Sequence, residues 1–144
     1  MSKARNRARR LAVQALYEWQ MTGTSEADIK LRFLEDKKDK TVDKDYFNEM
    51  IAGVIDKATE LDETISPFLK RPLAEIDRVE HAVLRLSTYE LIHRLDIPYR
   101  VVINEGVELA KTFGGEQGHK FINGILDKLA NSLRSAEAGS SRRS

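Results

Sequence analysis

The sequence predicts an all-α protein of about seven helices, packed together as two small three-helix bundles. Apolar residues recur with the spacing of one helix face along most of the chain. The 144 residues are 41% hydrophobic and 33% charged with only 8 Gly, a composition typical of a helix-rich globular domain. The strongest strand candidate, 99–103, leads directly into a helical pattern. We therefore expect helices throughout.

The first helix is expected over about residues 3–22. At 100° per residue its apolar side chains fall within an arc of roughly 140°, the width of a core-facing stripe. Gly23 is expected to end this helix in the left-handed conformation. Ser25, with Asp28 three residues later, has the spacing of an N-cap and predicts a short second helix through Leu34.

A long third helix is expected from Asp43 to Ser66-Pro67, because proline disfavours helical geometry in the residue before it. The polar run 37–40 that precedes it is expected to be a loop. A turn at 68–69 follows the helix.

Three more helices are expected in the second half. Asp77 and Glu80 have the spacing of a capping box. The helix after them, 79–95, is apolar nearly all round and predicts the buried centre of a bundle. The last two helices are expected over about 97–113 and 118–134.

The proline-marked region 66–78 divides the chain into bundles of about 3–65 and 76–134. Together they form one expected domain, 1–134. The polar tail 135–144 is expected to be disordered. The dipeptide Asn123-Gly124 would ordinarily indicate a hairpin, but its helical surroundings predict a helix interior, in which Gly124 lets another helix approach closely.

Composition excludes several kinds of chemistry. The chain has no Cys, which rules out disulfides, thiolate zinc sites and cysteine nucleophiles. No apolar run approaches the ~20 residues of a membrane-spanning helix, and the basic N-terminus lacks the apolar stretch of a signal peptide. We expect a cytoplasmic protein with no membrane partner.

Signals of catalysis are weak. The three histidines lack metal-ligand spacing and are interpreted as surface or packing residues: His81, His93 and His119. The glycines near residue 115 match neither a dinucleotide-binding loop nor a Walker loop. Asp62 and Glu63 lie in a charged run, which is typical of a solvated face. We expect no enzyme activity, no cofactor and no metal site.

The net charge of +1 conceals two opposite poles. Residues 1–10 carry five cations and no acid, whereas residues 41–68 carry seven acids and two lysines, a net −5. A basic arm indicates a phosphate-bearing partner, while an acidic segment fits a basic partner or solvent.

One side of the first helix combines cations with an aromatic ring. Opposite the apolar arc, five residues align on one expected ridge: Lys3, Arg7, Arg10, Gln14 and Tyr17. Guanidinium groups bind phosphates, Gln can bond a base edge, and Tyr can stack on an unpaired base. The ridge predicts RNA binding. Alternatively, the basic arm aids solubility and Tyr17 is a half-buried core residue, or the arm binds DNA or an acidic protein.

The start of the last helix is a second candidate. The unpaired amides of residues 118–121, together with the charge of Lys120, are typical of an anion site. From the residues alone, Phe121 is interpreted as a core anchor.

Several segments resemble the bacterial NusB family of transcription antitermination factors, in the same order from about residue 4 to 134. They are RARRLAVQALYEWQ (7–20), VEHAVLRL (79–86) with YEL (89–91), PY (98–99) with INE (103–105), ELAK (108–111) and HKFINGILDK (119–128). The resemblance implies a non-catalytic factor that binds single-stranded boxA RNA of ribosomal RNA leader transcripts as a heterodimer with NusE, a small-subunit ribosomal protein. With other Nus factors it would help elongating RNA polymerase to avoid premature termination.

The resemblance also implies site residues. Combined with the ridge, the expected RNA-binding residues are Lys3, Arg5, Arg7, Arg9, Arg10, Gln14, Tyr17, Lys120 and Phe121. The expected NusE-facing residues are Glu80, Arg85 and Tyr89. The chain departs from the family at Gln117-Gly118, where some relatives have Asp-Ser.

Two alternatives stay open. One is a protein-interaction module whose basic arm binds an acidic partner. The other is a stand-alone relative of the N-terminal module of RNA cytosine methyltransferases, although 144 residues leave no room for a catalytic Rossmann domain.

Overall fold

The computed structural model describes residues 3–35, 41–114 and 117–137, and these residues are helical throughout apart from their connections. Their seven α-helices are α1 Lys3–Thr22, α2 Glu26–Glu35, α3 Lys44–Asp56, α4 Ala58–Ile65, α5 Arg78–His93, α6 Tyr99–Phe113 and α7 Gly118–Leu133. Two short 3-10 turns lie at Ser66–Phe68 and Leu73–Glu75. The predicted all-α class is confirmed. Within the described ranges, none of the helices is long and apolar enough to cross a membrane.

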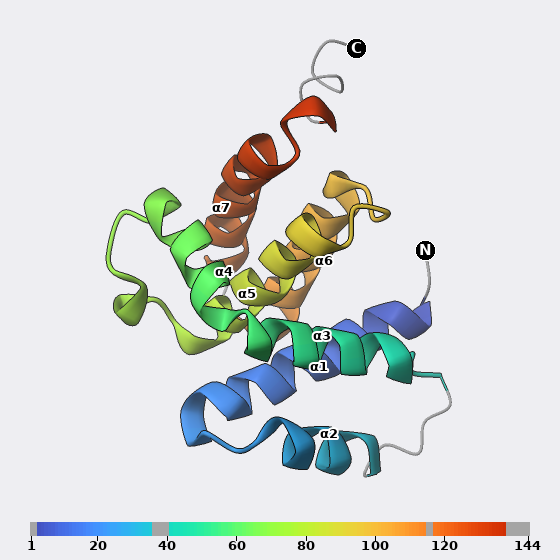
Figure 1. Ribbon diagram of the computed structural model, residues 1–144. Coiled ribbons are helices and arrows are strands. Elements are labelled where there is room, and N and C mark those ends of the chain that lie inside the picture. Colours follow the sequence, from blue (N-terminus) through green and yellow to red (C-terminus); the bar gives the residue numbers. More distant parts are fainter. Residues whose placement is uncertain (1–2, 36–40, 115–116, 138–144) are drawn as a thin grey trace.

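The helices form two groups around a shared core (Figure 1). In the first group, α1 and α3 lie side by side and α2 packs against both. In the second group, α5, α6 and α7 pack against one another. Helix α5 also contacts α1, α3 and α4, so it joins the two groups. Every residue from His81 to Leu91 is buried, as predicted for a central helix.

The local signals at helix ends are confirmed. Gly23 ends α1 with a φ of 72°. Ser25 Oγ accepts a hydrogen bond from the Asp28 amide at 3.2 Å, and α2 begins at Glu26, directly after Ser25. The Asp43 side chain caps α3 and the Asp77 side chain caps α5. Each accepts hydrogen bonds from backbone N–H groups in the first turn of its helix.

The prediction of one continuous helix over 43–65 is wrong at a single position. Lys57 has φ −107° and ψ 16°, so α3 ends before it and α4 begins after it. The bend lets Asp62 on α4 reach His81 and Arg85 on α5. The apolar spacing continues across the bend and contains no sign of it.

Residues 135–137, the first part of the predicted tail, are more ordered than predicted. Residues 135–137 are helical, and the Glu137 carboxylate accepts the Tyr99 N–H at 3.1 Å, which caps the start of α6. The buried Arg134 guanidinium donates to the carbonyl oxygens of Leu91 and Ile97 at 2.8 and 2.9 Å. The expected disorder is therefore wrong for 135–137. The rest of the predicted tail and the predicted loop 37–40 lie outside the described residues.

The close approach of a neighbouring helix that was predicted at Gly124 occurs at Gly106 instead. Gly124 lies inside α7 as expected, but it is exposed, and a Cβ there would meet nothing within 4 Å. At Gly106 on α6 a Cβ would lie 2.5 Å from Leu126 Cδ1 and 2.9 Å from Ser87 Oγ. The close approach of α5, α6 and α7 therefore depends on Gly106.

These two glycines yield a matched pair of predictions. Gly106→Ala overpacks the contact between α6, α5 and α7 and should lower the free energy of unfolding by about 1–3 kcal/mol. Gly124→Ala adds a good helix former at an open helical position and should raise it by about 0.5–1 kcal/mol. Urea unfolding followed by circular dichroism measures both, and equal effects would contradict this packing.

Candidate nucleic-acid interface

The predicted ridge lies on the outer side of α1. Lys3, Arg10 and Gln14 are exposed, Arg7 is partly exposed, and Tyr17 exposes 39% of its surface. Hydrogen bonds at the limit of useful length hold two of them: Arg7 donates to the Thr41 carbonyl at 3.4 Å, and Gln14 to the Arg10 carbonyl at 3.3 Å. Helical phase therefore assembles these five side chains on one face.

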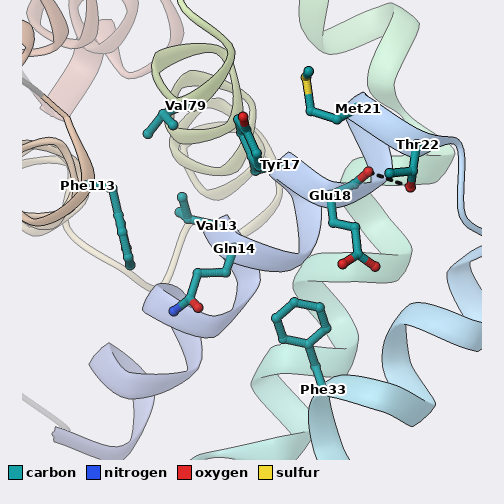
Figure 2. Close-up of a pocket in the computed structure, with 9 residues that line it drawn as sticks. All are labelled: Val13, Gln14, Tyr17, Glu18, Met21, Thr22, Phe33, Val79 and Phe113. Atoms are coloured by element: carbon teal, nitrogen blue, oxygen red, sulfur yellow. Dashed lines mark hydrogen bonds between the residues drawn. The ribbon is translucent and has the colours of Figure 1, made fainter.

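Two neighbouring hollows run along this ridge. The first, called here the cationic hollow, has a volume of about 290 Å³ and is lined by Arg7, Arg10, Leu11, Gln14, Val42, Thr112 and Phe113. The second, called the aromatic hollow, has a volume of about 510 Å³ and is lined by Val13, Gln14, Tyr17, Glu18, Met21, Thr22, Phe33, Val79 and Phe113 (Figure 2). Gln14 and Phe113 line both hollows. The surface thus passes continuously from cations to aromatic rings.

Arg9 does not lie on this surface. It is only 2% exposed, and its guanidinium forms a salt bridge at 2.9 Å to Glu90, near the C-terminal end of α5. The Tyr46 hydroxyl also donates to the Glu90 carboxylate, and Arg9 donates to the Asn6 side chain at 2.7 Å. The expectation that Arg9 faces RNA is therefore corrected: its charge is buried and bound to Glu90.

The electrostatics of this cluster follow from its burial. Burial opposes the charge on Arg9, but the neighbouring Glu90 carboxylate outweighs it and raises the Arg9 pKa. Burial raises the pKa of Tyr46, and the negative Glu90 raises it further. The tyrosine therefore stays a hydroxyl donor and the arginine stays charged.

Arg5 lies on the side of α1 that faces α3, away from the ridge. It is partly buried, and its guanidinium carbon is 4.6 Å from the centre of the Tyr46 ring, at cation–π distance. A helical wheel contains the signal for both arginines, because Arg5 falls inside the apolar arc and Arg9 about 20° beyond its edge.

The start of α7 presents the second group of expected RNA contacts. Lys120 is exposed and lines a polar hollow of about 380 Å³ with Asn104, Val107, Glu108, Lys111, His119 and Asn123. Phe121 is only partly buried and packs against the edge of the core. Lys120 is therefore accessible to an anion, while Phe121 combines packing with partial exposure.

The three expected partner-facing residues do not form one patch. Glu80 lies against the start of α7, where a Cβ on Gly118 would be 2.9 Å from Glu80 Oε2. Arg85 is largely buried and faces α4 and α1. The ring of Tyr89 occupies the space that a side chain on Gly53 of α3 would fill.

Asp62 is not the solvated acid that its charged surroundings indicate. Its carboxylate accepts hydrogen bonds from Arg85 Nε and Nη2 at 2.9 and 2.6 Å, and lies 2.8 Å from His81 Nε2. Arg85 also donates to Gln20 Oε1 at 3.1 Å and stacks over Trp19. This cluster joins α1, α4 and α5. Glu63 beside it is exposed, as predicted.

Comparisons with known proteins extend the resemblance to most of the chain. Residues 6–131 match the model of the NusB family. The chain is 57% identical over 125 residues to the transcription antitermination protein NusB of Shewanella halifaxensis, covering 87% of this chain and 93% of that protein. This chain belongs to the NusB family. It is also 50% identical over 139 residues to the transcription antitermination protein NusB of Alcanivorax borkumensis, covering 96% and 93%.

Solved structures of NusB-family proteins share the fold. NusB of T. maritima has a TM-score of 0.79 at 36% identity, over 91% of this chain and 93% of that one. A second similar chain comes from a crystal structure of the antitermination factors NusB and NusE in complex with double-stranded RNA. It has a TM-score of 0.83 at 27% identity, over 92% of this chain and 99% of that one.

Two residues of this interface were not expected from the sequence. Phe113, at the end of α6, lines both hollows beside α1, and Lys111 lines the polar hollow beside Lys120. Sequence periodicity places Phe113 on an apolar stripe of its own helix. It carries no sign that α1 lies next to it, because that contact is between distant segments of the chain.

The buried position of Arg9 predicts a stability defect in its variants. Arg9→Met leaves the Glu90 carboxylate buried without its partner and should lower the free energy of unfolding by about 3–5 kcal/mol. Adding Glu90→Gln removes that charge and keeps an acceptor for Tyr46, so the double variant should recover much of the loss. Urea unfolding measures both. An Arg9→Met protein that is as stable as wild type but binds RNA more weakly would return Arg9 to the interface.

The Asp62 cluster predicts a pH dependence. Burial acts to raise the Asp62 pKa, but hydrogen bonds from His81 and Arg85 outweigh it and lower the pKa. An acid whose folded pKa is below its unfolded value of about 3.9 stabilises the fold above that pH and loses this contribution as pH falls through the folded pKa.

Asp62→Asn should therefore reduce the free energy of unfolding more at neutral pH than near pH 3. Urea unfolding at both values tests this, with Glu63→Gln as the exposed control on the same helix. An Asp62→Asn deficit that is equal at the two pH values would show that the ionised carboxylate contributes nothing specific.

Proposed function

We propose that this chain is an RNA-binding transcription antitermination factor, which binds the boxA element of ribosomal RNA leader transcripts together with NusE. The observation that carries the proposal is the exposed face of α1, on which cations lead to Gln14 and an exposed Tyr17, in a chain of the NusB family. The relatives' names describe transcription antitermination proteins, and a NusB chain of the same fold occurs in a complex with NusE and RNA.

The order of side chains along α1 gives each a chemical role. Arg7 and Arg10, with Lys3 and Arg5 nearer the N-terminus, neutralise backbone phosphates, and Arg can bind two phosphate oxygens at once. Gln14 reads a base edge, and Tyr17 stacks on an unpaired base. Lys120 adds a phosphate contact at the start of α7, and Phe121 an aromatic edge.

The proposed NusE contacts are Glu80, Arg85 and Tyr89 on α5. These three side chains face different neighbours. We therefore assign the direct contact with NusE to Glu80, which is only partly buried. Arg85 and Tyr89 then act by positioning α4 and α3, whose surface carries the exposed acids Asp56, Glu60 and Glu63. An acidic surface of this kind favours a basic partner.

In the cell, the complex of this chain with NusE and boxA would join other Nus factors on elongating RNA polymerase and suppress premature termination. This places its action in the cytoplasm. The protein contributes binding rather than catalysis, and the proposed role requires neither cofactor nor metal.

Two competing functions predict different binding. A module whose basic arm binds an acidic protein would not distinguish boxA from scrambled RNA. A relative of the methyltransferase module would not gain RNA affinity from NusE. Electrophoretic mobility shift with both RNAs, each with and without NusE, separates these cases. Equal shifts for the two RNAs under both conditions would defeat the proposal.

Variants of the ridge give the quantitative test. Tyr17→Ala should cost about 1–3 kcal/mol of boxA binding through the lost stacking. Without Arg9, about four cations remain near α1, and Lys120 makes a fifth. The log–log salt dependence of single-strand binding should therefore have a slope of about −3.5, and Arg7→Ala with Arg10→Ala should reduce its magnitude by about 1.4.

Fluorescence anisotropy at several salt concentrations measures both quantities. The matched control is Lys70→Ala with Lys128→Ala, which removes two exposed cations away from α1. If the ridge variants bind boxA as tightly as this control does, the ridge is not the RNA surface.

A further inference from the structure

The aromatic hollow has walls from four helices that are distant in sequence. Tyr17 and Val13 come from α1, Phe33 from α2, Val79 from α5 and Phe113 from α6. In Figure 2, Val13 and Val79 lie between the ring of Phe113 on one side and that of Tyr17 on the other. The volume of about 510 Å³ is within the range of sites that hold small organic groups. The hollow is therefore a largely apolar binding site with an aromatic ring at each side.

The position of this hollow argues for an occupant that is part of a nucleic acid. Gln14 and Phe113 also line the cationic hollow, whose other walls include Arg7 and Arg10. A group in the aromatic hollow is therefore next to a surface that attracts phosphate. An unpaired nucleobase fits both features, because it is flat, has apolar faces and is attached to a phosphate backbone.

The acid in the wall does not oppose this occupant. Glu18 forms a salt bridge with Arg32 of α2, so its charge is compensated. Gln14, at the boundary of the two hollows, supplies an amide that can bond the edge of a base.

We propose that the aromatic hollow is a subsite for one unpaired base of the RNA strand whose phosphates lie along Arg7 and Arg10, with Phe113 as a second stacking ring opposite Tyr17. This inference rests on the proposed function and extends it, because it assigns a role to a residue of α6 and continues the RNA path away from the basic arm. The hollow favours an unpaired strand, since a paired base would first have to lose its pairing and stacking, which costs a few kcal/mol.

The test combines a protein variant with RNAs that lack single bases. Phe113→Leu keeps an apolar side chain but removes the ring, and it should weaken binding of boxA RNA about 5- to 100-fold. Phe113→Tyr keeps the ring and should bind like wild type. Phe68→Leu, a partly buried aromatic in the Ser66–Phe68 turn, is the matched control and should not change the affinity.

Abasic substitutions at successive positions of the RNA then locate the base. With the wild-type protein, one abasic position should reduce RNA affinity strongly. With Phe113→Leu, the same abasic position should reduce affinity little further, because the ring on which the missing base would stack is already absent. Fluorescence anisotropy measures each affinity, and circular dichroism verifies that each variant is folded.

The outcomes separate the subsite from the function it rests on. If Phe113→Leu retains wild-type affinity and the same abasic profile while Arg7→Ala with Arg10→Ala binds weakly, the subsite is refuted and the RNA function stands. If neither variant affects boxA binding, RNA binds elsewhere and the subsite is refuted together with the ridge. If wild type does not distinguish boxA from scrambled RNA, the proposed function itself fails. If Phe113→Leu loses NusE but keeps RNA, the hollow holds a protein side chain and the inference is overturned.

Discussion

The buried salt bridge between Arg9 and Glu90 fixes how α1 faces the rest of the protein. Arg9 points inward to Glu90, near the C-terminal end of the fully buried segment of α5, and Tyr46 of α3 binds the same carboxylate. A helix with an arginine bound in this way cannot rotate about its axis without leaving two charges unpaired in the core. The outward direction of Arg7, Arg10, Gln14 and Tyr17 follows from it. Two arginines on the same turn thus serve opposite purposes, one buried for orientation and one exposed for binding.

The same central helix explains the acidic pole of the chain. Asp62 binds His81 and Arg85 of α5, and Glu49 of α3 forms a salt bridge at 2.9 Å with Arg94, just after α5. Part of the acidic segment therefore attaches α3 and α4 to α5. Asp43 caps α3, and the remaining acids are exposed. The net charge of +1 thus combines a basic surface on α1, an acidic surface on α3 and α4, and ion pairs that hold the two in place.

Local interactions are the part of this molecule that its sequence predicts well. Gly23, Ser25 and Asp77 act within a few residues of themselves, so their types and spacing define the helix ends. Helical phase likewise predicts which side of α1 faces solvent. The errors concern contacts between distant segments: Arg9 finds Glu90 at 81 residues' separation, and Phe113 reaches the hollows beside α1. The bend at Lys57 and the close approach at Gly106 depend on what lies opposite each residue, which periodicity in a single helix does not contain.

We propose that RNA binds along the outer face of α1 and across the end of α6. The most direct measurement is a titration of the ¹⁵N-labelled protein with boxA RNA, followed by two-dimensional NMR of the backbone amides. Resonances of the outer α1 residues and of Phe113 should shift or broaden first, while those of Glu60 and Glu63 on α4 should stay unchanged. Perturbations confined to α4 and its surroundings, with α1 unaffected, would contradict it.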